Sequence, residues 1–289
     1  MNALQTLKTT LLDLDRVIGD KVPLIIGGGF GLYLRQEQLR ESNEQTLIQQ
    51  LPEPRATNDI DLFIGMEVLV NVDKVKAMRQ EIEKLGFTPI EKAKYFQWVQ
   101  NKADGGQVKI DILCGPLGNF SEQLHTNGLP RIRPKAPSGE LRFHARHTDE
   151  AIEVDTRSIA IQIQGQCSDG KEKRSTIYIP HPFTYLMMKL FAFDDRKNDP
   201  EKDDGRHHAM DLYRTVGMMN ESEYEEALAL GNSYNQDKRV KRARQIVSNS
   251  FDKEFDLGII RLREHTLFRP EFDIQKFQSV LKEILVIPE

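Results

Sequence analysis

The sequence holds few cysteines and no long apolar run, and both absences exclude classes of protein. Only two cysteines, Cys114 and Cys167, occur among its 289 residues, far apart and without metal-type spacing. This excludes a disulfide framework and a cysteine-rich zinc module, and a reducing, cytoplasmic setting is the expected one. No apolar stretch approaches the roughly 18 residues that a membrane-spanning helix needs, so no membrane partner is expected.

The first twenty residues also lack the uninterrupted apolar segment of a signal peptide. Leucine, valine and isoleucine recur there at helical spacing, and Asp13, Asp15 and Asp20 interrupt them. This pattern predicts an amphipathic helix over Met1–Asp20 rather than a targeting segment.

The chain has no strong net charge, because 44 acidic residues balance 40 basic ones to leave −4. Such a balance argues against wholesale coating of nucleic acid. Two local basic segments remain, residues 131–135 with Arg142 and Arg146, and residues 238–244. Each is either an ordinary solvated face or a binding surface for phosphates.

Length and composition are those of a folded protein with one large domain or two modest ones, since 39% of residues are apolar and 29% are charged. Hydrophobic periodicity and turn residues predict the elements. Helices are expected over 1–20, 30–39, 72–85, 182–193, 206–216, 221–230, 238–247 and 274–285. Strands are expected over 23–26, 60–64, 95–100, 108–113, 141–144, 158–163 and 177–180, with a hairpin-like turn at Asp104-Gly105-Gly106 and a loop or helix-plus-loop over 41–54.

The order of these elements predicts an α/β (α+β) fold. Residues 1–120 would form a core with a small mixed β-sheet and flanking helices. Residues 121–180 would be a partly β connecting region, and residues 181–289 a mainly helical C-terminal domain.

Three aspartates on two expected strands are the strongest functional signal. Asp59 and Asp61 alternate with Ile60 and Leu62, so the two carboxylates share one face of their strand. Asp111 is a third carboxylate on the next strand pair. Like charges so close repel unless a cation lies between them, and Mg²⁺ (or Mn²⁺) prefers such oxygen ligands.

A glycine run follows the first expected strand, at Gly27-Gly28-Gly29. Glycine lets the backbone approach a phosphate closely. Beside three carboxylates, this arrangement suits nucleotidyl transfer, in which divalent ions neutralise phosphate charge during in-line attack on the α-phosphorus. Asp111 could then help to deprotonate the acceptor hydroxyl.

The order of these motifs resembles the nucleotidyltransferase superfamily that includes DNA polymerase beta. The motifs are Gly28-Gly29, then Arg55-x-Thr57-x-Asp59-Ile60-Asp61-Leu62, then Lys109-Ile110-Asp111. In the second half, the pattern is similar to AbiE-type abortive-infection toxin nucleotidyltransferases. It comprises Pro182-Phe183-x-x-Leu186-x-x-Lys189-Leu190-x-Ala192-Phe193, Arg206 and Asp211-Leu212-Tyr213. The resemblance covers the first ~115 residues and roughly 180–216, about half the chain.

The resemblance implies a role for each matched residue. Catalytic roles fall to Asp59, Asp61, Asp111, Lys189 and Asp211, and the first three of these would bind the metal. Nucleotide contacts fall to Gly28, Gly29, Arg55, Thr57 and Lys189. Lys189 would meet a phosphate, and Asp211 would orient Lys189 or the acceptor.

The implied activity is Mg²⁺-dependent transfer of a nucleoside monophosphate from an NTP to an acceptor hydroxyl. RNA, and tRNA in particular, is the favoured acceptor, and an antitoxin protein is an implied partner. Two alternatives stay open: a protein or small-molecule acceptor, and a nucleotide-binding module without turnover. The glycine run argues mildly for the last, because a third glycine and Phe30 follow where many relatives have a hydroxyl residue. The three carboxylates argue against it, because their repulsion would be costly without a metal.

Several of these side chains also have structural interpretations. Lys189 could extend from a core helix, and Asp211 could form an ion pair with Arg214. Adjacent residues on a helix point in different directions, so we expect solvent or local hydrogen bonds rather than a metal at His207-His208. Trp98 and its aromatic neighbours are expected to pack against the sheet rather than to stack on bases.

Overall fold

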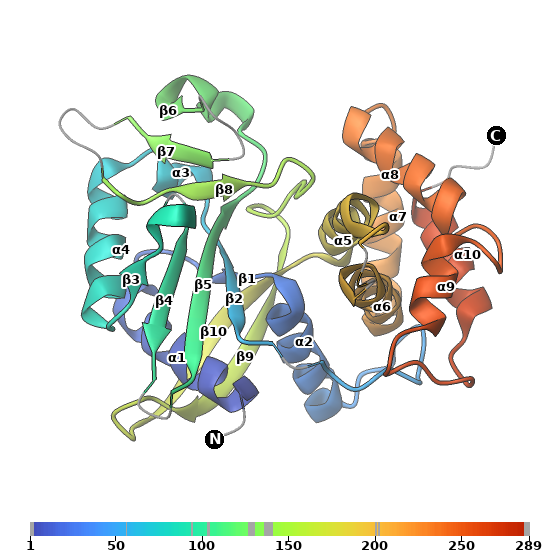
Figure 1. Ribbon diagram of the computed structural model, residues 1–289, viewed down its shortest axis with the longest axis horizontal. Coiled ribbons are helices and arrows are strands. Elements are labelled where there is room, and N and C mark those ends of the chain that lie inside the picture. The colour runs from blue at the N-terminus through green and yellow to red at the C-terminus, as the bar shows by residue number, and fades with distance from the viewer. Residues whose placement is uncertain are drawn as a thin grey trace. The chain divides into compact units, whose positions relative to one another are not determined.

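The protein is a mixed α/β structure in a computed structural model (Figure 1) that describes residues 3–55, 57–93, 95–102, 105–126, 131–135, 141–199, 201 and 203–285. Ala56 and Asp104, which belong to the predicted site motif and turn, lie outside these residues. The chain divides into two compact units. The first comprises residues 1–34 and 55–180, and the second residues 35–54 and 181–289.

The first unit is built on one mixed sheet, whose main order is β6-β7-β8-β5-β2-β1-β10-β9, with β4 also paired to β5 and β3 paired to β4 (Figure 1). Its strands are β1 (Ile25–Ile26), β2 (Asp59–Phe63), β3 (Thr88–Pro89), β4 (Gln97–Asn101), β5 (Gln107–Cys114), β6 (Leu124–His125), β7 (Arg131–Pro134), β8 (Ala145–His147), β9 (Ser158–Gln166) and β10 (Glu172–Pro180). The helices of this unit include α1 (Ala3–Ile18), α3 (Met66–Leu69) and α4 (Val72–Lys84), and helix α2 (Gly28–Ser42) begins in it.

Alternation along the central strands separates two faces of this sheet. Ile60 and Leu62 of β2 and Ile110 and Ile112 of β5 are fully buried, while the residues between them are half-buried. Helices α1 and α4 pack together, and α1 contacts β9 and β10. Ser175 of β10 donates a hydrogen bond to Asp15 of α1. The registers of β10, β1 and β2 put Ser175 on the same sheet face as Ile60 and Leu62, so α1 covers that face and Asp59 and Asp61 lie on the opposite one.

The predicted connecting region joins this same sheet. Strands β7, β8, β9 and β10 all come from residues 121–180, and β10 pairs with β1 while β8 pairs with β5. The sheet is therefore larger than expected, because residues distant in sequence extend it at both sides. The strand predicted over 141–144 lies instead at Ala145–His147, since Phe143 leaves the ladder to pack its ring 5.8 Å from Trp98.

Element boundaries differ in three informative places. Helix α2 begins at Gly28, so two glycines of the expected loop form its first turn. Strand β4 starts at Gln97, not at 95, because Tyr95 adopts a φ of 65° that a strand does not allow. Trp98 is fully buried in the sheet, as predicted.

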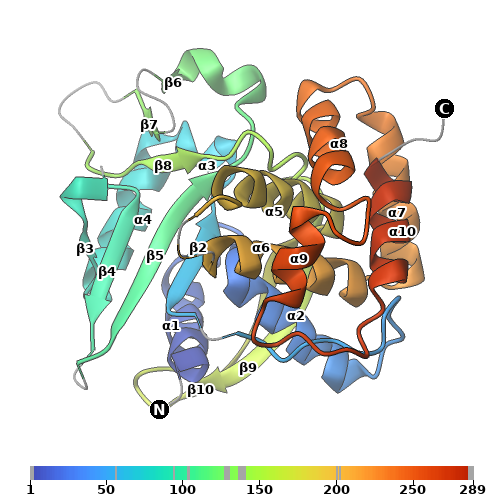
Figure 2. The same cartoon turned by 45° about the vertical axis from the view of Figure 1, so that its right-hand side comes forward.

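The second unit contains helices and no strand among its described residues (Figure 2). They are the second half of α2 with α5 (Pro182–Arg196), α6 (Asp203–Met218), α7 (Glu221–Ser233), α8 (Lys238–Ser250), α9 (Leu257–Arg263) and α10 (Ile274–Leu285). Helices α5 and α6 pack side by side, and α9 and the short α3 were not predicted.

Local signals explain why two of these helices begin where they do. Pro182 occupies the first turn of α5, where its missing N–H costs nothing, and Asn220 with Glu223 forms a capping box at α7. Glu223 also accepts a 2.5 Å bond from Arg35, which ties α2 to α7 inside this unit. None of the helices described is both long enough and apolar enough to cross a lipid bilayer.

Candidate functional site

The three predicted carboxylates lie on adjacent parallel strands. Strands β2 and β5 pair in a register that sets Asp61 directly beside Asp111 and Asp59 beside Lys109. Neighbouring strands are about 4.8 Å apart, and paired residues of parallel strands point to the same face. The register therefore gathers Asp59, Asp61 and Asp111 on the sheet face opposite α1.

Burial and charge set the electrostatics of this face. The amide of Gln97, on the neighbouring β4, donates a 3.0 Å hydrogen bond to Oδ2 of Asp111. Burial raises the pKa of Asp111 above its ordinary value; the Gln97 bond opposes that shift and the nearby charge of Asp59 adds to it. Oδ1 of Asp59 and Oδ1 of Asp111 are buried without a hydrogen-bond partner among the described residues. Two buried carboxylate oxygens without a donor are costly unless a ligand supplies one.

The first turn of α2 closes one side of the carboxylate face. The backbone N–H of Gly27 donates a 2.8 Å bond to the carbonyl of Asp61, which anchors the turn on β2. Gly28 has a φ of 62°, and a Cβ there would lie 1.7 Å from Oδ2 of Asp61. Only glycine satisfies both the backbone conformation and the close approach of this carboxylate.

Arg55 lies beside the same turn, and Thr57 precedes β2. The guanidinium of Arg55 approaches Gly29 so closely that an added Cβ would lie 3.0 Å from it. The hydroxyl of Thr57 accepts a 3.4 Å bond from the backbone N–H of Asp59. The seven site residues predicted in the first unit, from Gly28 to Asp111, are thus arranged around β2, β5 and the start of α2.

The donor set suits a hard divalent cation, although the side chains do not form a closed cage. Among the residues that the structure describes, no group of three His, Cys, Asp or Glu side chains is arranged to hold a metal ion. The two partnerless oxygens of Asp59 and Asp111 and the adjacent carboxylate of Asp61 are nevertheless ligands of the kind that Mg²⁺ prefers.

Lys189 and Asp211, the other two predicted catalytic residues, belong to the second unit and contact each other. Lys189 Nζ of α5 lies 2.7 Å from Asp211 Oδ2 of α6, and their side chains are 9% and 0% exposed. Arg214 lies 3.5 Å from the other oxygen of Asp211. The ion pair that the sequence suggested between Asp211 and Arg214 is therefore present together with the Lys189 contact.

His207 contacts a second histidine of its own unit. Its Nδ1 lies 3.0 Å from Nε2 of His265, a residue distant in sequence. Sequence reasoning missed Gln97, and it placed Arg146 in a basic segment without connecting it to Asp111; both residues lower the pKa of Asp111. Only the strand register reveals Gln97, because no motif marks it.

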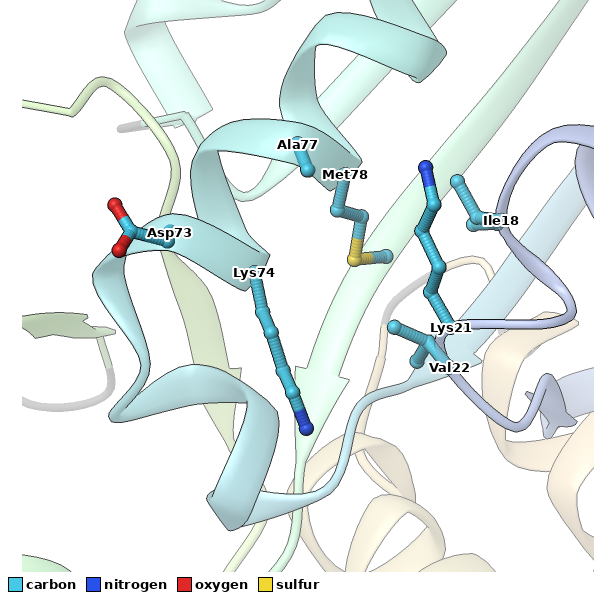
Figure 3. Close-up of a pocket in the computed structure, with 7 residues that line it drawn as sticks. All are labelled: Ile18, Lys21, Val22, Asp73, Lys74, Ala77 and Met78. Carbon is cyan, nitrogen blue, oxygen red and sulfur yellow. The ribbon is translucent and has the colours of Figure 1, made fainter.

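A cavity of about 340 Å³ lies on the other, helical face of the first unit (Figure 3). It is lined by Ile18, Lys21, Val22, Asp73, Lys74, Ala77 and Met78, from the end of α1 and the start of α4. The apolar side chains converge there, and the carboxylate of Asp73 points away from them. None of its lining residues is a predicted site residue.

Comparisons of the chain with protein-family models, with curated protein sequences and with solved structures found no match.

Proposed function

We propose that this protein is a Mg²⁺-dependent nucleotidyltransferase of the DNA polymerase beta-like superfamily, similar to AbiE-type toxins. It would move a nucleoside monophosphate from an NTP to an acceptor hydroxyl. The observation that carries the proposal is the register of β2 and β5, which sets Asp61 beside Asp111 on the face that also holds Asp59. The Gly28 turn supports it, because this turn lies against Asp61, where a Cβ at Gly28 would be 1.7 Å from the carboxylate oxygen Oδ2.

In this proposal the residues of the first unit bind the metal, place the phosphates and accept the proton. Asp59, Asp61 and Asp111 would hold one or two Mg²⁺ ions, which supply charge neutralisation for the triphosphate. The turn at Gly28-Gly29 would place the phosphates by backbone contact, with Arg55 beside it. Asp111 would accept the proton of the acceptor hydroxyl as its oxygen bonds to the α-phosphorus and the bond to the pyrophosphate breaks.

We propose RNA, with tRNA first, as the acceptor, and an antitoxin protein as a partner that restrains the activity. Both rest on the resemblance to AbiE-type proteins. The phosphate-binding and orienting roles of Lys189 and Asp211 stay predictions.

Transfer of label is the direct test. The protein is incubated with each α-labelled NTP, Mg²⁺ and total tRNA, and label on RNA is followed by gel. We expect incorporation with at least one NTP, and loss of about two orders of magnitude or more in Asp59→Asn, which removes a ligand charge but keeps the side-chain size. Lys21→Gln, a change on the helical face, is the matched control and should retain activity.

The same experiment separates the alternatives. Label on the protein or on an added small molecule, with none on RNA, would favour a different acceptor. Nucleotide binding without any transfer, unchanged in Asp61→Asn, would overturn the proposal and favour a binding module. No label and no nucleotide binding under any of these conditions would also reject it.

A further inference from the structure

We propose that the RNA acceptor binds along a row of three cations on β7 and β8, here called the arginine strip (Arg131, Arg133 and Arg146). The choice of RNA as occupant rests on the proposed function. The strip itself rests on strand register, exposure and charge.

Register places the strip next to the carboxylate face. Arg146 of β8 pairs with Leu113 of β5, and Arg131 of β7 pairs with Arg146. Ile132 and Ala145, which alternate with these arginines, are buried on the helical side. The three guanidinium groups therefore emerge on the same sheet face as Asp111, two residues before Leu113.

Arg146 connects the strip to the carboxylate face. It pairs with Leu113, which lies two residues, or about 7 Å, along β5 from Asp111. Beside Asp111 itself the edge of β5 is occupied by Gln97 of β4. The charge of Arg146 already acts on Asp111, because it lowers the pKa that burial raises. A strand seated on the arginines would thus end within reach of the carboxylates.

Carboxylates do not neutralise the strip within the part of the chain that the structure describes. No ion pair is formed there with Arg131, Arg133 or Arg146; Arg146 is exposed, while Arg131 and Arg133 are half-buried. Arg131 and Arg146 lie directly opposite each other, an arrangement of like charges that destabilises a sheet. An anionic ligand that binds both would remove this repulsion.

The order of strands assigns the strip to the acceptor rather than to the NTP. The glycine turn follows β1 and contacts β2, on one side of β5, whereas β8 and β7 lie on its other side. If the phosphates of the NTP bind at the glycine turn, the arginines remain available to a second anionic ligand, the acceptor strand. Asp111 of β5 lies between the two.

Two arginines of the second basic segment, on α8, are already engaged within their own unit. Arg239 contacts Asp237 at 2.5 Å, and Arg242 contacts Asp194 at 3.1 Å while lying over the ring of Phe191. Such pairing leaves less charge for phosphates than the strip offers.

Arginine and histidine at this position fit the chemistry of RNA. Guanidinium groups bind phosphate oxygens in a bidentate manner, and exposed His125 of β6, the neighbour of Arg133, can stack on an unpaired base. We therefore commit to an RNA strand as the occupant.

Binding of labelled total tRNA without NTP tests the proposal independently of catalysis. We expect Arg131→Gln with Arg133→Gln to weaken binding about tenfold at low salt and to lower the slope of log K against log salt by about 0.7–0.9 for each lost contact. The matched control is Lys21→Gln with Lys74→Gln, the same charge change on the helical face, and it should keep the slope. Arg131→Lys with Arg133→Lys should restore most of the slope.

Two results would overturn the strip. One is unchanged tRNA affinity and slope in the glutamine variant, and the other is loss of NTP binding with tRNA binding intact. If the glutamine variant does not fold, arginine modification by phenylglyoxal in the wild type decides. Bound tRNA should protect Arg131 and Arg133 but not Arg16, which is exposed on α1 at the opposite face of the sheet. Equal reactivity with and without tRNA rejects the proposal.

The outcomes separate this inference from the proposed function. If the wild type transfers no label but the glutamine variant loses tRNA affinity, the proposed activity is rejected and the arginine strip stands. If the wild type labels tRNA and the glutamine variant binds and labels it equally well, the arginine strip is rejected and the proposed activity stands.

Discussion

At the scale of single residues, Gly28 makes the sharpest demand on the sequence. Gly28→Ala should destabilise the protein by more than the roughly 1–2 kcal/mol that a left-handed backbone costs an L-residue, because its Cβ also meets Asp61. Gly170→Ala is the control, since that φ of 80° has no heavy atom within 4 Å of an added Cβ. Urea unfolding of both variants measures the loss in free energy of unfolding. Equal losses would show that the Asp61 carboxylate does not restrict the side chain at position 28.

The charge of Asp111, which the proposed metal site needs, destabilises the folded protein when no metal is bound. Burial raises its pKa, so the native state holds this proton more tightly than the unfolded chain, and stability falls as pH rises through the raised pKa. Asp111→Asn keeps an oxygen for the Gln97 amide but loses the charge.

We therefore expect Asp111→Asn to unfold about 2–4 °C higher than the wild type at pH 7 in EDTA, for a gain of about 1 kcal/mol. The gain should vanish below about pH 4, where the Asp111 carboxyl of the wild type is protonated and therefore as neutral as the asparagine of the variant. Nucleotidyl transfer should be lost at every pH. Thermal melts across this range provide the measurement, and a variant less stable than the wild type at pH 7 would contradict it.

At the scale of elements, local patterning predicted most helices and strands but not their partners. The alternation of Ile60 and Leu62 with aspartates predicted β2. Gly86, with its positive φ, follows the end of α4 as expected. Strand β7 was missed because Arg131 and Arg133 alternate with only one apolar residue, Ile132, over four positions. A strand that short has too few residues for its periodicity to show.

The buried contact between α5 and α6 gives a prediction at this scale. Asp211→Asn should destabilise the protein by about 3–5 kcal/mol, because it leaves Lys189 and Arg214 buried without their carboxylate. Adding Lys189→Met should recover part of that loss.

A double-mutant cycle in urea measures this coupling, and strictly additive effects would contradict a direct Lys189–Asp211 interaction. The result also governs how activity is read. Loss of transfer in Asp211→Asn counts as catalytic only where the variant is shown to be folded.

At the scale of the whole molecule, the site depends on pairings that no local pattern contains. Asp61 and Asp111 are set side by side by a parallel ladder between segments some fifty positions apart, and Arg146 joins them through a further strand. The sequence supplied the carboxylates and the basic segment as separate features. Their order across one sheet is a property of topology, since a register shift of one residue would turn either strand's charges to the other face.

Ligand linkage in the intact chain is the last expectation. A non-reactive NTP analogue with Mg²⁺, at a hundred times its dissociation constant, should stabilise the folded state by about 2.7 kcal/mol. For a unit of this size that gain raises the melting temperature by about 5–10 °C. The double variant Asp59→Asn with Asp61→Asn should melt at the same temperature with and without the analogue. A full shift in that variant would place the nucleotide elsewhere, because binding that ignores both carboxylates cannot pass through a metal held by them.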